Sequence, residues 1–433
     1  MWRFDAGRRG ASEEELPENL YLQWVLELPA PKTAWPSNQV KLQFDRLYEP
    51  ILVGKAFFVP SMVSDKLTAY STETAEELWT FFAGGPIRFA PVAWRDLLYV
   101  VSDDGWLYCL KAVDGTVVWK LRGGPSNRRV LGNDRLTSAW PARGAPVVYD
   151  DKVYFGASIW PFMGVFLYAL DAETGNIIWT NSGTGSDYLV QQHNSPAFAG
   201  VAPQGYLAAT ENHLIVAGGR TIPAVFDRHT GRVKHFNVSR RDMGSKGGGG
   251  YEAIAGENVY INRGCMYDLE DGRFLGNLDA MVIGKNSIIG KDDAGIRGFL
   301  AETVEVEVKD RRGNPAKKRV MKSVWSTSLD EKIQRVFIQS GSRLYCRGAE
   351  KRVVAVDLPR LDLGAKISWQ ADFPDEPLNM ITGDGKLLVS TDKGRIYCFS
   401  GTEGDAKLKG VSNEPDEDRY APVSYTHLRA HET

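Results

Sequence analysis

Arginine and tryptophan residues gather in one long loop of the sequence and just after it, where they could bind a ligand. The loop spans residues 122–143 and carries five arginines, with Trp140 inside it and Trp160 following it. Arginine donates paired hydrogen bonds to carboxylates, and tryptophan offers a face for stacking. The combination suits a ligand with a carboxylate, an aromatic ring or a glycan. The alternative is a solvated loop whose arginines pair with acidic neighbours.

A second unusual segment, residues 191–205, places amides and one histidine (QQHNSPAF) ahead of a buried strand. We predict that Arg143, Trp160, His193 and Asn194 converge on one site. His193 and Asn194 would orient the ligand, Trp160 would stack on it, and Arg143 would bind its carboxylate or sugar hydroxyls. In the alternative, His193 caps a turn and Asn194 forms an Asx turn.

The cysteines offer no metal or haem chemistry. Cys109, Cys265, Cys346 and Cys398 are scattered, and none forms a CxxC pair. This spacing argues against a structural zinc site, a c-type haem attachment and a disulfide scaffold. We expect four free thiols, with Cys109, Cys346 and Cys398 on the third strands of different repeats. No metal site is predicted.

Composition narrows the class of protein. The 433 residues carry 52 basic and 54 acidic side chains, a balance that argues against a nucleic-acid partner. The 44 glycines and 12 tryptophans favour a β-rich fold with many turns. Apolar runs stay well below the roughly 18 residues of a membrane helix, so no transmembrane segment is predicted.

A nine-residue unit recurs along the chain and must position these segments. KAVDGTVVW (residues 111–119) and DAETGNIIW (residues 171–179) are clear copies. Aspartate and threonine favour a turn, and the glycine at the fifth position supplies the positive φ that the turn needs. Tryptophan at the ninth position can wedge between neighbouring sheets. The glycines are Gly115, Gly175, Gly231 and Gly272, and the tryptophans that end strands are Trp79, Trp119, Trp179, Trp325 and Trp369.

Apolar strands precede each unit, so each repeat has four strands, the composition of a propeller blade. Seven repeats lie near residues 48–83, 87–124, 139–185, 194–239, 249–278, 281–328 and 333–372. An eighth, at 377–400, lacks its last strand, which residues 20–28 supply with Trp24 in the wedge position. We therefore predict an all-β fold, an eight-bladed β-propeller of four-stranded blades, closed by the N-terminal strand.

The order of apolar strand, Asp-x-x-Thr-Gly, β-branched strand and Trp resembles the repeat of pyrroloquinoline-quinone (PQQ) proteins over residues 20–400. That repeat builds quinoprotein alcohol dehydrogenases and also a non-catalytic lipoprotein of the outer-membrane barrel assembly machinery. The resemblance therefore implies the fold and leaves the function open. The dehydrogenases would imply PQQ with Ca²⁺. The chain lacks their vicinal cysteines and a recognisable ligand set, so no cofactor is expected.

The two ends of the chain fall outside the repeat pattern. Residues 1–19 are predicted to be an N-terminal extension, and residues 401–421 a linker toward a missing C-terminal region. Residues 422–433 (PVSYTHLRAHET) resemble a translated sequencing adapter and are set aside as an artefact. A periplasmic or secreted location is expected if a signal peptide was lost upstream of Met1, and a cytoplasmic one otherwise.

The function predicted from these features is a non-catalytic binding or scaffold module of a bacterial envelope protein, and the chain is expected to be a fragment of a longer one. Its partner would be a protein, or a small polar or glycan ligand, at the propeller mouth. One alternative is a PQQ-dependent sugar or alcohol dehydrogenase. Another is the propeller half of a larger enzyme, such as a methyltransferase fusion.

Overall fold

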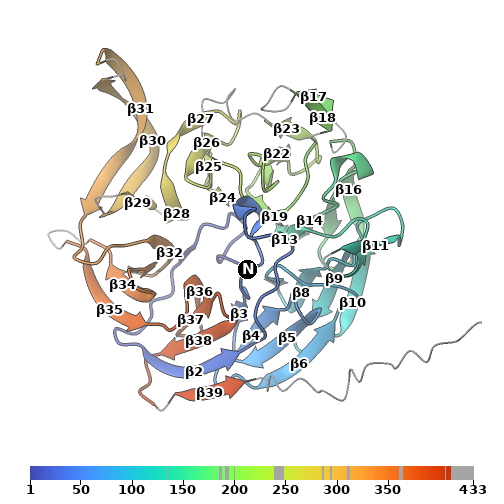
Figure 1. The fold of residues 1–433 in the computed structure, drawn as a ribbon, viewed down its shortest axis with the longest axis horizontal. Helices are drawn as coiled ribbons and strands as arrows, with labels where there is room; N and C mark the ends of the chain where they lie inside the picture. Colours follow the sequence, from blue (N-terminus) through green and yellow to red (C-terminus); the bar gives the residue numbers. More distant parts are fainter. Residues whose placement is uncertain are drawn as a thin grey trace, which may run out of the picture.

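The computed structural model is a ring of β-sheets around a central axis (Figure 1). It describes residues 1–132, 134–184, 188–190, 195–198, 200–237, 248–284, 287–292, 295–309, 313–359, 364–404 and 406–410. The helices in these ranges are two single turns, η1 (Val40–Leu42) and η2 (Pro161–Met163). Neither has the length or the apolar character that crossing a membrane requires.

Eight four-stranded antiparallel arrays follow one another around the ring, and each forms one blade. Blades 1 to 4 are β3 (Ile51–Val53), β4 (Ala56–Pro60), β5 (Lys66–Ser71) and β6 (Glu77–Phe82); β7 (Val92–Trp94), β8 (Leu97–Val101), β9 (Trp106–Lys111) and β10 (Val117–Arg122); β13 (Gly144–Tyr149), β14 (Lys152–Ala157), β15 (Phe166–Asp171) and β16 (Ile177–Asn181); and β20 (Ala208–Ala209), β21 (His213–Val216), β22 (Ala224–Asp227) and β23 (Val233–His235).

Blades 5 to 8 are β24 (Ile254–Ala255), β25 (Val259–Asn262), β26 (Cys265–Asp268) and β27 (Phe274–Asn277); β28 (Asp279–Ile283), β29 (Ile288–Asp292), β30 (Gly295–Lys309) and β31 (Pro315–Thr327); β32 (Arg335–Ser340), β33 (Arg343–Arg347), β34 (Arg352–Asp357) and β35 (Lys366–Asp372); and β36 (Pro377–Gly383), β37 (Lys386–Thr391), β38 (Arg395–Ser400) and β2 (Tyr21–Glu27). The predicted eight-bladed, all-β propeller is confirmed.

The N-terminal strand closes the ring as the sequence predicts. β2 pairs antiparallel with β38 and places Trp24 opposite Cys398. β39 (Lys407–Gly410) adds a parallel strand on the outer side of β2. The buried Trp24 indole donates a hydrogen bond of 3.0 Å to the Thr72 carbonyl of blade 1. Blade 8, which consists of both ends of the propeller, is thus joined to blade 1.

The repeated tryptophan and glycine meet at the seams between blades. The Trp119 indole donates a hydrogen bond of 2.9 Å to the Glu173 carbonyl in the turn of the next blade. In that turn Gly175 has a φ of 73°, and a Cβ built on it would lie 2.6 Å from the Trp119 ring. Glycine is therefore required twice, for the backbone conformation and for the space that the ring occupies.

The same contact recurs with variations. Trp79, Trp179 and Trp369 donate to the carbonyls of Ala112, Arg228 and Leu20. In blade 4, His235 replaces tryptophan and hydrogen-bonds the Leu269 carbonyl at 3.1 Å, with its ring over Gly272. Trp325 instead packs over Gly298 of its own blade, against the apolar cluster that blades 6 and 7 share. A histidine can therefore form a seam contact that the sequence pattern assigns to tryptophan.

The N-terminal segment, residues 1–12, lies inside the ring against the innermost strands (Figure 1). The amides of Ala209, Ala255, Ile283 and Gln339, from four successive blades, donate to the carbonyls of Ala6, Gly7, Arg9 and Gly10. β1 (Ala11–Ser12) then pairs parallel with β32 of blade 7. Trp2 is buried, and its ring stacks on Tyr206 at 3.6 Å. This segment thus packs against the innermost strands at the centre of the ring.

All four cysteines are free and buried, which confirms the expectation of free thiols. The expected third-strand position is right for Cys109 and Cys398 but wrong for Cys346, which lies on the second strand, β33. Both middle strands of a blade are buried, so an apolar triplet such as Leu-Tyr-Cys suits either of them.

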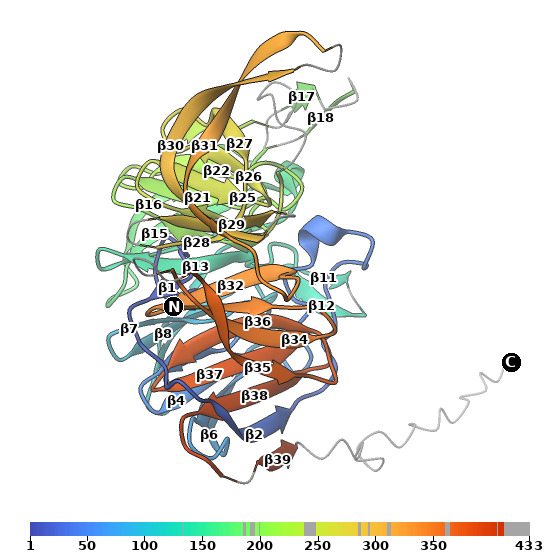
Figure 2. The same ribbon diagram turned by 90° about the vertical axis from the view of Figure 1, so that its left-hand side faces the viewer.

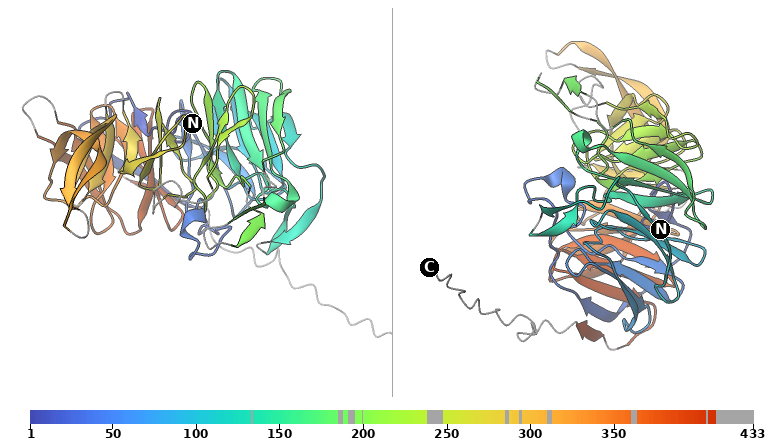
Figure 3. Two further views of the ribbon diagram at one scale, coloured as in Figure 1. Left: turned by 90° about the horizontal axis from the view of Figure 1, so that it is seen from above. Right: turned by 90° about the vertical axis from the view of Figure 1, so that its right-hand side faces the viewer.

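Further elements extend from the blades or add to them. The β30–β31 hairpin extends beyond the rim (Figure 2). On one face of the ring lie η1 and two small hairpins, β11–β12 (Arg129–Gly132 and Arg135–Ser138) and β17–β18 (Tyr188–Val190 and Pro196–Phe198) (Figures 2 and 3). β19 (Gly205–Tyr206) pairs parallel with β13 of blade 3. η1 and the two small hairpins thus give this face of the ring loops and hairpins that could form a binding site.

Candidate functional site

A loop between β2 and β3, residues 29–50, contains η1 and runs between two cavities on this face. Residues 34–36 of the loop line one cavity, while Val40, Gln43 and Arg46 line the other. We call this segment the mouth loop. The two cavities have different chemistry, one largely apolar and the other rich in arginine, and are described in turn.

Buried charges hold the mouth loop in place. Asp45 of the loop accepts hydrogen bonds from the Ala34 amide at 2.9 Å and from Arg88. Arg88 also binds Asp103 at 2.7 Å, and Arg143 donates to both oxygens of Asp103 at 2.8 and 2.9 Å. Burial alone would raise the pKa of Asp103, but Arg143 and Arg88 outweigh it and hold that pKa well below its ordinary value. The network needs all its members, because an unpaired buried charge is costly.

The first cavity, of about 510 Å³, is lined by two of the four residues predicted to form a site, Arg143 and Trp160. Trp160 is 43% exposed, and its ring lies edge-on to Trp35 at 6.2 Å. Arg143 is buried and directs two of its nitrogens at Asp103. His193 and Asn194 lie outside the described residues. The structure thus brings Arg143 and Trp160 to one cavity, and the four-residue ligand site stays a prediction.

Large apolar side chains are exposed around this cavity, and we call them the hairpin face. Leu131 and Leu136 sit opposite each other on β11–β12 and are 79% and 57% exposed. Phe162, in η2, is 64% exposed and lies next to Trp160. The face consists of Val130, Leu131, Leu136, Trp160 and Phe162. It is anchored from below by an ion pair between Arg135 and Asp65 of blade 1.

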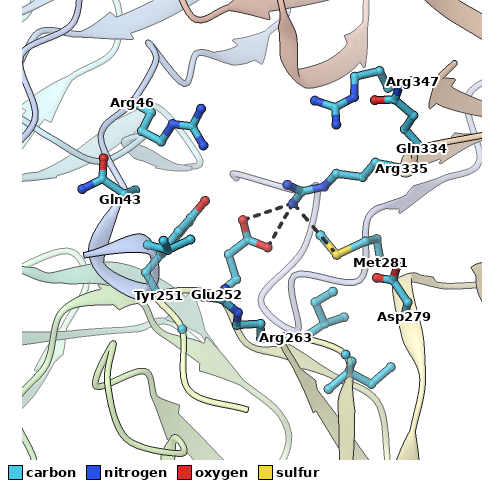
Figure 4. Close-up of a pocket in the computed structure, with 15 residues that line it drawn as sticks. Gln43, Arg46, Tyr251, Glu252, Arg263, Asp279, Met281, Gln334, Arg335 and Arg347 are labelled. Atoms are coloured by element: carbon cyan, nitrogen blue, oxygen red, sulfur yellow. Dashed lines mark hydrogen bonds and ion pairs between the residues drawn. The ribbon is translucent and has the colours of Figure 1, made fainter. Parts of the chain in front are cut away.

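The second cavity, of about 480 Å³, opens among blades 5, 6 and 7 and the mouth loop (Figure 4). We call it the arginine funnel. Arg335 of β32 lies 3.3 Å from Glu252, and Arg347 of β33 pairs with Glu376 at 2.5 Å. Figure 4 shows the head groups of Arg46, Arg335 and Arg347 turned toward the same space. Its charged lining residues are Arg46, Arg263, Arg335, Arg347, Glu252 and Asp279.

A buried carboxyl group, Glu49, lies beneath the funnel. Tyr206 donates a hydrogen bond to it, and Arg3 of the N-terminal segment lines the same small recess as Glu49. Burial raises the pKa of Glu49 to about 8, and the nearby Glu252 adds to the increase. Glu49 is therefore mostly protonated at neutral pH, whereas Glu252 is matched by Arg335. The recess holds only about 30 Å³, too little space for an organic anion, whereas the open funnel above it is far larger.

The residues at the centre of the ring do not fit PQQ and its calcium ion. Trp2, Arg3 and Arg8 are buried inside the ring, where they contact strands of several blades and occupy space that a flat cofactor would need. In the described part of the chain, no group of three or more His, Cys, Asp or Glu side chains could hold a metal ion. We therefore derive no step through PQQ.

The sequence points to two residues that line the first cavity, Arg143 and Trp160, and to none that line the funnel. The segment with five arginines is a visible local cluster, and it leads directly to Arg143 and the β11–β12 hairpin. Arg335 and Arg347 of the funnel face each other across the β32–β33 hairpin, but Arg46 and Arg263 come from distant segments that only the closed ring brings to them. Arg335 and Arg347, twelve positions apart, carry no local pattern that distinguishes them from ordinary surface arginines.

Comparison with known proteins agrees with the repeat pattern. Residues 32–260, slightly more than half of the chain, match the family model described as outer membrane protein assembly factor BamB. A tetrathionate hydrolase of Acidithiobacillus ferrooxidans is 26% identical over 225 residues. The match covers 48% of this chain and 39% of that protein, so the chain spans well under two thirds of this relative.

Solved structures share the fold at low sequence identity. BamB from Moraxella catarrhalis is 12% identical with a TM-score of 0.51, over 89% of this chain and 99% of that one. Quinohemoprotein alcohol dehydrogenase from Comamonas testosteroni is 13% identical with a TM-score of 0.56, over 94% of this chain and 81% of that one. At such identities the likeness shows the fold alone, because propellers of this kind support different functions.

Proposed function

The chain belongs to the family of the outer membrane protein assembly factor BamB, and from this premise we propose that it is a non-catalytic binding module. Its partner is a protein, and the surface that receives the partner is the hairpin face. We also propose a location in the bacterial envelope, because the family description refers to assembly of outer-membrane proteins.

The observation that carries the proposal is the exposure of Leu131 and Leu136 on a two-stranded hairpin. A two-stranded hairpin is marginally stable in water by itself. Leaving two leucines side by side in solvent adds nothing to the stability of the ring. Grouped exposed apolar side chains on a folded protein mark interaction sites. The hairpin face has this character, and its cavity offers space for an inserted side chain.

The surroundings of the hairpin face define the chemistry of the partner. Arg128 and Arg129, at the start of β11, are exposed beside Val130 and Leu131. Carboxylates on the partner would complement them. Among the strands that the structure describes, β11 and β12 pair with no other strand than each other, so their outer edges can accept an added strand. We therefore propose an extended segment with apolar side chains flanked by acidic residues.

The predicted ligand residues have a place in this proposal. Trp160 and Trp35 would stack on an aromatic or long apolar side chain inserted into the first cavity. Arg143 would act as a positioning residue, because its bonds to Asp103 hold the cavity wall. His193 and Asn194 remain candidates for polar contacts with the same partner.

Peptide binding tests the proposal. Random peptides displayed on phage are selected on the purified chain, and the affinity of a selected peptide is measured by fluorescence anisotropy. Leu131→Asp should weaken binding at least about tenfold, because it places a carboxylate in an apolar contact and beside acidic flanks. The matched control is Val113→Asp, since Val113 is 81% exposed in the β9–β10 turn and lines neither cavity.

Two outcomes would overturn the proposal. One is a selection that yields no peptide sensitive to Leu131→Asp. The other is equal weakening by Val113→Asp, which would indicate binding to exposed apolar groups in general. Reduction of a dye by alcohols or sugars after addition of PQQ and Ca²⁺ would instead support the dehydrogenase alternative.

A further inference from the structure

We propose that the arginine funnel is a binding site for a small dianion that carries oxyanion groups. The class includes inorganic sulfate and phosphate and the same chemistry on a small organic molecule, such as a short dicarboxylate. The site is separate from the hairpin face, and the proposal does not rest on the protein-binding role.

The first argument is the balance of charge. Four arginines and two acidic residues line the funnel, which leaves an excess of two positive charges. Two ion-paired neighbours outside the lining offset each other, because Glu376 pairs with Arg347 while Lys291 lies 3.6 Å from Asp279. A dianion would neutralise the excess, whereas a monoanion would neutralise half of it.

The second argument is hydrogen bonding. The Nε atoms of Arg335 and Arg347 are buried and have no hydrogen-bond partner among the described residues. A buried donor without an acceptor is unfavourable, and native proteins rarely leave one unpaired. Glu252 contacts Arg335 through the terminal nitrogen at 3.3 and 3.4 Å and so leaves Nε unpaired. These Nε atoms are closed off from solvent, so an oxyanion in the funnel would bind the terminal nitrogens of the arginines, whose planar fork suits it.

The third argument is repulsion among the arginines. Burial lowers the pKa of Arg347, and the positive charges of Arg335 and Arg46 lower it further against the opposing effect of Glu376. These three side chains come from the mouth loop and from two strands of blade 7, and Figure 4 shows that they face one space. Like charges held close together by a fold are stabilised when a counter-ion binds between them.

The size of the funnel favours a ligand with some organic body. Its volume of about 480 Å³ lies within the range of small-molecule sites. Val40, Ile254, Ile261 and Met281 contribute apolar surface to the same cavity. Charged groups of the ligand would face the arginines, and a short carbon skeleton would contact this apolar side. Inorganic ions would bind the same arginines without contacting the apolar side of the cavity.

Calorimetric titration of the full chain at constant ionic strength tests the proposal. The probes are sodium sulfate, sodium phosphate and disodium succinate, with sodium acetate as the monoanion. We expect saturable binding of the dianions and binding of acetate at least about tenfold weaker. Tighter binding of succinate than of sulfate and phosphate would identify an organic ligand, and the reverse order would identify an inorganic one.

Substitutions then locate the site. Arg46→Gln removes an exposed funnel arginine and should weaken dianion binding about tenfold to a hundredfold without unfolding the chain. The matched control is Arg273→Gln, because Arg273 is equally exposed in the β26–β27 turn and does not line the funnel. Leu131→Asp should leave the dianion affinity unchanged, which separates this site from the hairpin face.

The proposal is overturned if none of the three dianions binds saturably. It is also overturned if acetate binds as tightly as succinate, since the site would then not recognise a double charge. Equal weakening by Arg46→Gln and Arg273→Gln would show that the anions bind to general surface charge. In either variant, an unchanged circular dichroism spectrum and melting temperature confirm that the fold is intact.

Discussion

Gly175→Ala tests the seam between blades 2 and 3. The substitution adds one methyl group in a turn whose φ is 73°, at a point 2.6 Å from the Trp119 ring. No real Cβ tolerates such an approach, so the ring must move. A displaced Trp119 loses its hydrogen bond to the Glu173 carbonyl and part of its contact with the next blade.

The expected magnitude comes from three contributions. The left-handed conformation costs about 1–2 kcal/mol for a residue with a Cβ. Loss of the indole hydrogen bond adds about 1 kcal/mol, and loss of apolar burial about 1–2 kcal/mol. We therefore expect Gly175→Ala to lower the free energy of unfolding by about 3–5 kcal/mol, as the sum of these terms.

Gly264→Ala is the matched control, because Gly264 has a φ of 72° and open space where its Cβ would lie. It should cost only the conformational term of about 1–2 kcal/mol. Urea unfolding followed by tryptophan fluorescence and circular dichroism measures both variants. In a Trp119→Ala background, the extra cost at Gly175 should disappear. Equal costs at Gly175 and Gly264 would refute the steric reasoning for the seam.

Three further predictions concern buried groups. Arg143→Ala should lower the free energy of unfolding by about 3–5 kcal/mol, because it leaves the buried Asp103 with Arg88 as its one ion-pair partner within the described ranges. The control Arg273→Ala should stay within about 0.5 kcal/mol of wild type in the same urea assay. An Arg143→Ala variant as stable as wild type would contradict the stabilising role of this buried charge network. The pKa of Glu49 rises from 4.5 to about 8 on folding, so stability falls between these pH values as the unfolded chain loses a proton that the folded chain keeps. Glu49→Gln should flatten the melting temperature over that interval, and an unchanged slope would argue against a protonated Glu49. Thiol titration of the unfolded, unreduced protein should find four reactive groups, and two or fewer would contradict the placement of the cysteines.

The fold could be predicted from the sequence because its main determinants are local. A turn of Asp-x-x-Thr-Gly and a tryptophan four residues after the glycine specify both a hairpin and the seam contact that Trp119 makes with Gly175. The same pattern identified Trp24 as the missing wedge of blade 8, a pairing between residues more than 370 positions apart. His235 occupies the ninth position of the repeat, as the pattern predicts, but this position holds a histidine in place of the usual tryptophan.

The functional surfaces were only partly predictable because they depend on long-range contacts. The arginine-rich segment pointed to Arg143, but sequence alone could not show that Asp103, forty residues earlier, binds it. Nor could it show that residues 1–12 enter the centre of the ring, since their carbonyls bind four blades through backbone amides that any residue provides. The arginine funnel was missed for the same reason, because the mouth loop, blade 5 and blade 7, which supply its arginines, become neighbours only in the closed ring.

The central claim is that the hairpin face receives a protein partner, and site-specific photo-cross-linking tests it most directly. A benzophenone amino acid is introduced at Leu131, and separately at Val113, in bacteria that carry the gene, followed by irradiation of intact cells. The account predicts one discrete protein adduct from position 131 that is absent from position 113 and is lost when Phe162→Asp is added. The same adduct from both positions, or an adduct from position 131 that survives Phe162→Asp, would contradict it.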